Sequence, residues 1–206
     1  MAPPRTGTSA AAGRNGDGPL TSAAQRDRQT RILDACLMLA SKGGYEAVQM
    51  RVVAEQAGVA LGTLYRYFPS KIHLLVAALA REFERTQEKM DRVSIPGDTP
   101  GERMLFVLGR MTRNMQRSPM LTEAMTRAFM FADPSAATEV NAVARLMEGI
   151  LSRAIHEGEE PSADEAAIAR IIGDVWLSNL VAWVTRRASA NDVQEHLELA
   201  VKLLLR

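Results

Sequence analysis

Four residues in one short segment carry the groups best suited to specific polar contacts: Thr63, Tyr65, Arg66 and Tyr67. Hydroxyl and guanidinium groups donate hydrogen bonds to phosphate oxygens and to base edges. The segment is predicted to be a helix from about Leu61 to Phe68, because the residue before Pro69 is disfavoured in the α region. Two tyrosines and an arginine on the exposed side of so short a helix exceed what solvation requires. They indicate contact with a polyanion.

A second short helix is predicted immediately before this one, over residues 50–57, and Gly58 separates the two. Two short helices joined by a tight turn form a helix-turn-helix, whose second helix enters the major groove of DNA. Five apolar residues are placed to pack the pair against a preceding helix: Val53, Ala57, Val59, Leu64 and Phe68. The segment therefore predicts a DNA-binding unit.

The rest of the ordered chain is predicted to be helical as well. A first helix runs from Gln25 to the breaking pair Gly43–Gly44, and Ser70 is placed to cap a long fourth helix. Apolar residues then recur at helical spacing, and no long segment alternates with a period of two. The fold class is all-α, with about nine helices; the last five are expected at 102–116, 119–131, 135–156, 163–187 and 191–205.

Composition and charge divide the chain. It has 206 residues, 47% of them hydrophobic and 24% charged, which excludes wholesale disorder. Residues 25–75 carry a net charge of +3 and residues 76–206 carry −3. We predict a disordered tail over 1–24, a DNA-binding domain over 25–71 and a second, larger domain over 72–206. A single cysteine, Cys36, leaves no disulfide within the chain.

The segment GVALGTLYRYFPSK resembles the recognition segment of the TetR family of bacterial regulators. The resemblance implies a homodimer that reads a palindromic operator in double-stranded DNA. It further implies that residues 72–206 form an all-helical effector-binding and dimerisation domain. It also implies that Gly62 lets the backbone approach DNA and that Lys71 binds phosphate at a helix N-terminus. The predicted DNA-contacting residues are Arg51, Gly62, Thr63, Tyr65, Arg66, Tyr67 and Lys71.

The resemblance extends to one subgroup, the KstR-type repressors of sterol catabolism in mycolic-acid actinobacteria. The segments that carry it span most of residues 25–205: SKGGYEAVQMR, GTLYRYFPSK, LTEAMTRA and DVWLSNL. It implies repression of cholesterol catabolism genes and release by a coenzyme A thioester of a sterol acid. The alternative within the family is a repressor that senses a fatty acyl-CoA or another hydrophobic molecule.

Residues 102–131 are rich in methionine and phenylalanine, and flexible thioethers can line a cavity for a bulky apolar ligand. The alternative is an ordinary bundle core. Trp176 and Trp183 share one face of a later helix. The predicted effector-binding residues are Met104, Phe106, Met111, Met115, Met125, Phe129, Trp176 and Trp183.

The last two predicted helices are the candidates for a dimer interface. No metal site, catalytic site or cofactor is expected, because the three histidines are scattered and hydrolase, Walker and dinucleotide motifs are absent. An acyl-thioester or sterol enzyme and an architectural DNA binder without effector remain the rival functions. No apolar run approaches a membrane span, and a secretory signal is lacking, so we expect a cytoplasmic protein that joins the nucleoid when bound to DNA.

Overall fold

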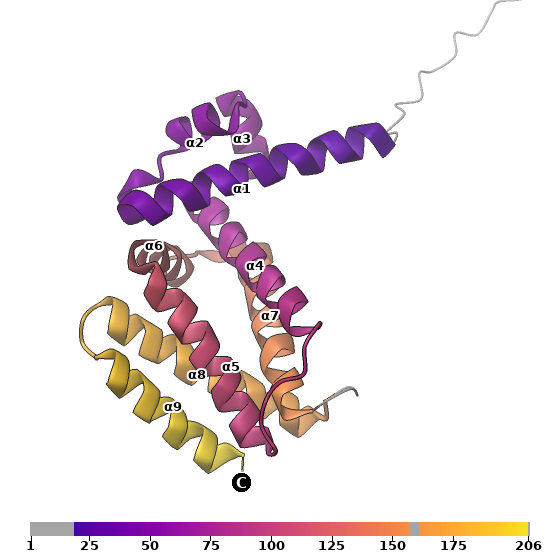
Figure 1. Ribbon diagram of the computed structural model, residues 1–206. Coiled ribbons are helices and arrows are strands. Elements are labelled where there is room, and N and C mark those ends of the chain that lie inside the picture. Colours follow the sequence, from indigo (N-terminus) through magenta and orange to yellow (C-terminus); the bar gives the residue numbers. More distant parts are fainter. Residues whose placement is uncertain (1–18, 157–160, 206) are drawn as a thin grey trace, which may run out of the picture.

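A computed structural model describes residues 19–156 and 161–205, with side chains described from residue 23 onward. The described residues form nine α-helices and one 3-10 helix, without a strand. The predicted all-α class is therefore confirmed. Figure 1 shows two parts: α1, α2 and α3 make a small N-terminal unit, and a long helix leads from it into a larger helical body.

Helix α1 (Pro19–Ala47) begins earlier than the sequence predicted. Residues 19–24 were assigned to a disordered tail, and that assignment is wrong for them, because they form the first turns of α1. Proline is tolerated in a first helical turn, and alanine has the highest helix propensity, so both residue types are compatible with a helix that starts at Pro19. Residues 1–18 of the predicted tail lie outside the described residues.

The predicted break in the first helix is present. Gly43 and Gly44 have non-helical backbone angles, and Gly44 has a φ of 65°, which a residue with a side chain adopts only under strain. The short turn that follows the kink carries Tyr45 toward helices of the C-terminal body.

Helices α2 (Met50–Ala57) and α3 (Leu61–Tyr67) form the predicted helix-turn-helix. Gly58 ends α2 in the left-handed conformation, with φ of 63°, and its N–H bonds to carbonyls of the last turn. Arg31 of α1 donates from Nη1 to the carbonyl of Ala57 at 2.5 Å, so a cation lies at the negative end of α2. Val53, Leu64 and Phe68 are buried in the hydrophobic core.

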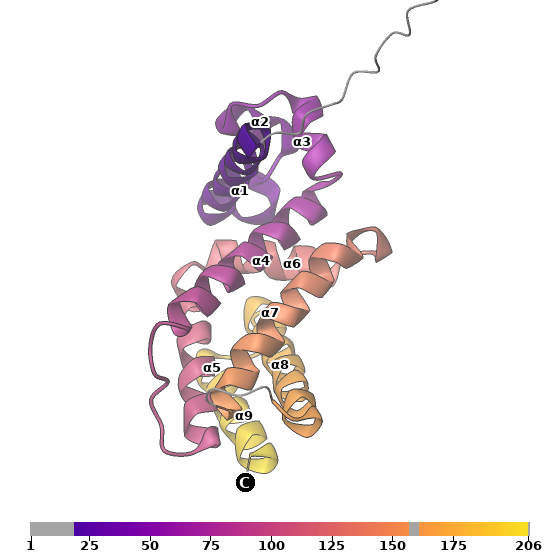
Figure 2. The same cartoon turned by 90° about the vertical axis from the view of Figure 1, so that its right-hand side faces the viewer.

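Helix α4 (Lys71–Met90) connects the two parts of the molecule. Ser70 caps it by accepting from the N–H of His73. The imidazole of His73 is buried; its Nδ1 lies 2.9 Å from Ser70 Oγ and its Nε2 lies 3.1 Å from the carbonyl oxygen of Ser135. Figure 2 shows α4 running from the helix-turn-helix down one side of the body, beside α7.

Five further helices complete the body around α4. Capping boxes begin three of them, at Thr99, Ser162 and Ser189, where a serine or threonine and an acidic residue satisfy orphan N–H groups. The observed bounds lie within a few residues of those predicted: α5 (Pro100–Arg117), α6 (Pro119–Met130), α7 (Ala137–Ile155) after the 3-10 turn η1 (Pro134–Ala136), α8 (Ala163–Val184) and α9 (Ala190–Leu204).

Helix α8 corrects the expectation that no apolar run approaches a membrane span. By length and composition alone its 22 residues are sufficient to cross a bilayer, and it is the one such helix among the described residues. It packs on α6, α7 and α9. Only 28% of its most apolar stretch is buried within the subunit. Ile171 on this helix is 49% exposed, which leaves an apolar surface available to a partner.

Candidate DNA-contacting face and effector cavity

Helix α3 presents the face that the sequence predicted. Leu64 and Phe68 anchor the helix in the core, whereas Tyr65 is 46% exposed and Arg66 is also exposed. Among the described residues, the hydroxyls of Thr63 and Tyr65 have no hydrogen-bond partner within the chain. These groups are therefore free to bond an external acceptor.

Gly62 lies in the first turn of α3 and has no steric reason to be glycine. A Cβ built at this position would meet no atom within 4 Å, and the backbone does not require a positive φ. Glycine in a helix costs about 0.5–1 kcal/mol relative to alanine. The open space beside the Gly62 backbone agrees with the predicted close approach of DNA.

Tyr67 and Lys71 are less accessible than predicted. Both are half-buried. The Tyr67 ring packs 6.4 Å from Phe68, and Arg66 lies 6.0 Å above it. Lys71 donates from Nζ to the carbonyl of Tyr45 at 3.1 Å, which uses one of its three N–H donors. Both side chains thus support the fold as well as bordering the α3 face.

Arg51 lies on α2 and is highly exposed, as expected of a DNA-contacting residue. Its guanidinium lies 3.6 Å from Glu55, one turn along the helix, with both side chains mostly in solvent. An exposed pair of this kind contributes little to stability, so the arginine is readily released for another anion.

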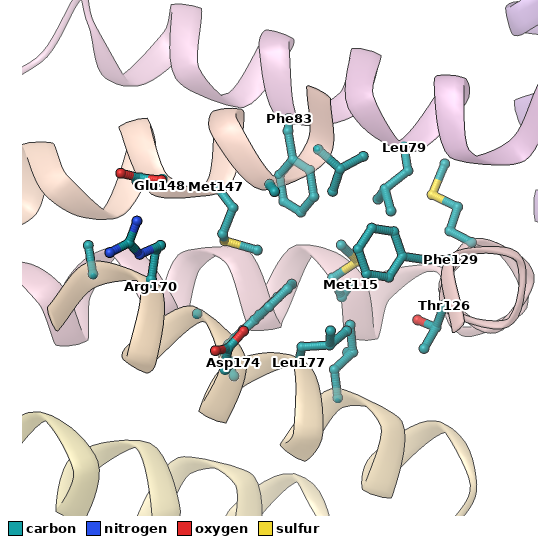
Figure 3. Close-up of a pocket in the computed structure, with 17 residues that line it drawn as sticks. Leu79, Phe83, Met115, Thr126, Phe129, Met147, Glu148, Arg170, Asp174 and Leu177 are labelled. Atoms are coloured by element: carbon teal, nitrogen blue, oxygen red, sulfur yellow. The ribbon is translucent and has the colours of Figure 1, made fainter. Parts of the chain in front are cut away.

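An apolar cavity of about 200 Å³ lies in the C-terminal body, bounded by α4, α5, α6, α7 and α8. In Figure 3, Leu79 and Phe83 point into it from α4, and Phe129 and Thr126 enter from α6. Trp176 forms part of its wall and is held by an edge contact with Phe83 at 6.3 Å and a hydrogen bond from its Nε1 to Thr112 at 3.0 Å.

Four of the eight predicted effector-binding residues line this cavity, namely Met115, Met125, Phe129 and Trp176. The other four do not. Met104 and Met111 are buried in the core, and Phe106 packs against that core. Trp183 lines a separate surface cleft beside Gly44 and Met120. The methionine-rich stretch is thus divided between the cavity wall and ordinary core.

Sequence reasoning missed most residues of the cavity wall. These residue types occur in any helical core, and the residues come together only in the folded structure. The apolar spacing of residues 74–83 was visible in the sequence, but it did not distinguish a core from a cavity. The missed residues are Leu79, Phe83, Thr126, Val143, Ala144, Met147, Glu148, Ala169, Gly173, Leu177 and Leu180.

The cavity opens between α7 and α8, where its lining residues become exposed. Ala144, Arg170 and Asp174 are exposed, and Glu148 is half-buried. Figure 3 shows Arg170 and Glu148 at the same end of the cavity. Glu148 also borders a second cleft of about 570 Å³, lined by Arg145, Ser152, Arg153 and His156 among others. An apolar pocket and a basic cleft therefore meet at one carboxylate.

Among the described residues, the cysteine is not set up to react and no cluster of side chains is set up to bind a metal ion. Burial raises the pKa of the Cys36 thiol to about 12, so the thiolate that reacts is not formed near neutral pH. Within the same residues, no set of three His, Cys, Asp or Glu side chains is grouped to hold a metal ion.

Comparisons with known proteins match both parts of the chain. The family described as "Bacterial regulatory proteins, tetR family" matches residues 32–78. A second family, "Tetracyclin repressor-like, C-terminal domain", matches residues 97–204. The chain therefore belongs to the TetR family, and it is a transcriptional regulator rather than an enzyme.

Its relatives include repressors of the KstR type. The chain is 63% identical to the HTH-type transcriptional repressor KstR of Mycolicibacterium smegmatis over 186 residues, which cover 90% of this chain and 91% of that protein. It is also 63% identical to KstR of Rhodococcus jostii, over 92% and 88% of the two chains. A TetR regulator from Rhodococcus sp. RHA1 superposes with a TM-score of 0.81 at 32% identity, covering 88% of this chain and 97% of that one. The present chain is a transcriptional repressor of the KstR type.

Proposed function

We propose that this protein is a homodimeric, cytoplasmic repressor of sterol catabolism genes, and that a sterol-acid coenzyme A thioester releases it from its operator. The cavity carries the proposal, because Leu79 and Phe83 of α4 form part of its wall. The same helix begins at Lys71, three residues after the buried end of the recognition helix. A ligand that displaces α4 therefore acts on the DNA-contacting unit.

The size of the cavity supports coupling between ligand and DNA. Ligand pockets usually enclose roughly 300–1,000 Å³, and this cavity has about 200 Å³. A rigid sterol ring system thus enters only if the lining helices move apart. The thioethers of Met115, Met125 and Met147 suit a wall that must adapt in this way.

The basic cleft next to the cavity supports a thioester rather than a free sterol. Arginine binds phosphate through a fork of donors. Arg170 lies at the cavity mouth, and Arg145 and Arg153 line the adjoining cleft. Arg153 also pairs with Asp91, whereas the exposed Arg145 has no partner among the described residues. We propose that the coenzyme A phosphates bind here.

The exposed apolar faces of α8 and α9 support the dimer. Ile171 is 49% exposed on α8, and Leu199 and Leu203 are more than half exposed on α9. Two copies of this face packed together form a four-helix interface with two helices from each subunit. Two recognition helices related by such an axis suit a palindromic operator with half-sites about 34–36 Å apart.

Titration of an operator complex tests the proposal. The chain's own upstream DNA, fluorescently labelled, is bound by the protein and followed by anisotropy. Cholestenoic acid coenzyme A thioester, free cholestenoic acid and stearoyl-CoA are added in parallel. We expect the sterol thioester to release the DNA at the lowest concentration.

The three arms separate the alternatives. Release by stearoyl-CoA at lower concentration supports a fatty acyl-CoA sensor. Release by the free acid alone contradicts the role of the basic cleft. No release by any of the three, with operator binding intact, contradicts the proposed effector class. Hydrolysis of the thioester by the protein would contradict its assignment as a regulator.

A further inference from the structure

The ring of Tyr45 lies between the DNA-binding unit and the effector-binding body, and two cations contact it. The ammonium of Lys71 is 3.9 Å from the ring centroid, and the guanidinium carbon of Arg127 is 4.3 Å from it. Cations at such distances are attracted to the negative face of an aromatic ring. The hydrogen bond from Lys71 to the Tyr45 carbonyl adds a second contact to the same residue.

Arg127 connects this ring to the cavity. It lies on α6, between Thr126 and Phe129, which both line the cavity. Its guanidinium also pairs with Glu46 at 3.0 Å and lies 3.9 Å from Glu123. Glu123 in turn lies 3.4 Å from the backbone N–H of Tyr45 and accepts a hydrogen bond from it. Helix α6 thus holds the turn after the α1 kink through both a cation and a carboxylate.

This connection differs from the direct path through α4. In the direct path, Leu79 and Phe83 carry the displacement along the helix that begins at Lys71. In the second path, α6 moves Arg127, and the Tyr45 ring passes the change to the side chain of Lys71. Helix α4 determines the backbone position of Lys71, whereas the Tyr45 ring determines the orientation of its ammonium group.

We infer that Tyr45 and Arg127 are positioning residues for Lys71, which they hold aimed at the operator while the cavity is empty. The inference rests on the proposed function, because it takes Lys71 as a phosphate contact. Expansion of the cavity shifts α6, draws Arg127 from the ring and leaves the ammonium without its orientation. Tyr45 and Arg127 themselves need not touch DNA.

A double-mutant cycle on operator binding tests the inference without an effector. Arg127→Gln and Lys71→Ala are made singly and together, and the operator Kd is measured by anisotropy. We expect Arg127→Gln to weaken binding roughly three- to tenfold in the wild-type background and less than about twofold in the Lys71→Ala background. Arg117→Gln, at an exposed arginine of α5, controls for the lost charge.

Variants of the ring provide a second readout. Tyr45→Phe keeps the ring and the backbone carbonyl, which make all the contacts to Lys71, so its operator Kd and its response to the thioester should match the wild type. Tyr45→Leu removes the ring and should reproduce the loss seen with Arg127→Gln. Thermal unfolding of each variant shows whether the fold is kept.

Several outcomes would overturn the inference. Equal losses from Arg127→Gln with and without Lys71 would mean that the arginine acts elsewhere. Tyr45→Phe and Tyr45→Leu weakening binding alike would mean that the hydroxyl, rather than the ring, matters. Normal binding by Lys71→Ala would remove the basis for positioning, whereas the proposed DNA contact of α3 is judged separately from Tyr65→Ala.

Discussion

The polar face of α3 and the apolar cavity of the C-terminal body differ in how they are assembled. Helix α3 draws its polar face from seven consecutive residues, fixed by the buried side chains of Leu64 and Phe68. The cavity draws its wall from five helices that lie far apart in the sequence. The first surface is a local unit that keeps its shape, whereas the second depends on how the helices pack. A ligand-controlled regulator needs both. A DNA-binding unit of fixed shape can be moved by a conformational change in the body to which it is attached.

Removal of one side chain from the α3 face should give the largest effect. Tyr65→Ala is expected to weaken operator binding roughly 5- to 150-fold, since a lost nucleic-acid contact costs about 1–3 kcal/mol. Its melting temperature should stay near that of the wild type, because Tyr65 is 46% exposed and makes no hydrogen bond within the described chain. Anisotropy and thermal unfolding measure the two quantities.

Arg110→Gln is the matched control for this change, since Arg110 is exposed in the effector-binding body. Normal operator binding by Tyr65→Ala would show that α3 is not the reading face. A loss of binding that accompanies a large fall in melting temperature would show that Tyr65 supports the fold instead.

Blocking the mouth of the apolar cavity tests whether the effector enters there. Ala144 is exposed on α7 and lines the cavity, so Ala144→Phe should close the mouth at little cost in stability. We expect operator binding to be unchanged and the thioester concentration needed for release to rise about tenfold or more, because the ring occupies the entry path.

Asn141→Phe is the control for Ala144→Phe, because Asn141 is exposed on the same helix but does not line the cavity. It should respond to the thioester as the wild type does. An unchanged response from both variants would place the entry path elsewhere.

A smaller effect should separate folding from DNA binding at Gly62. Gly62→Ala adds a methyl group into open space and should stabilise the fold by up to about 1 kcal/mol. The same methyl group should weaken operator binding several-fold, because it lies between the backbone and the approaching phosphate. The melting temperature, measured by thermal unfolding, would then rise while the operator affinity, measured by anisotropy, would fall. Tighter or equal operator binding would contradict a close approach at this residue.

The smallest effect concerns pH and the helix caps. Hydrogen bonds from Ser162 hold the pKa of Glu165 below its ordinary value of 4.5, and bonds from Ser189 lower that of Asp192. A lowered pKa in the folded state gives stability that is present above the unfolded-state pKa and lost as the pH falls through the folded-state value. Glu165→Gln should therefore reduce the fall in melting temperature between neutral and acidic pH.

Glu84→Gln provides the comparison for the cap variant, since Glu84 is exposed on α4 and has no hydrogen-bond partner among the described residues. Its melting temperature should depend on pH as the wild type does. The same pH dependence in Glu165→Gln and the wild type would show that the capping box contributes nothing measurable to acid stability.

The exposed polar face of α3 could be predicted from the sequence because its signals are local, whereas its contact with DNA stays a prediction. Gly58 and Pro69 bracket α3, and the alternation of buried Leu64 with polar neighbours assigns the exposed side. The bounds of the later helices followed from the same kind of signal. Residues 19–24 did not, because the sequence PLTSAA contains no apolar periodicity to detect.

The cavity could be predicted only in part. Met115 and Met104 have the same type and lie eleven residues apart on one helix, but one lines the cavity and the other is sealed in the core. Leu79 and Phe83 have the spacing of any packed helix. Tertiary packing determines which apolar side chains line a cavity, and local sequence patterns do not distinguish these side chains from those of the core. The cation–π contact between Arg127 and Tyr45 joins residues 82 positions apart, so it could not be predicted from local sequence patterns either.

One distance tests the central claim, that filling the cavity moves the recognition helices. An Ala60→Cys variant carries a spin label at the exposed start of α3, and the inert buried thiol of Cys36 stays unlabelled. Pulsed dipolar spectroscopy then measures the separation of the two labels in the dimer. With operator we expect one narrow distribution that corresponds to helices about 34–36 Å apart, and with the sterol thioester a displaced one. An unchanged separation after the thioester has bound and released the DNA would contradict the account.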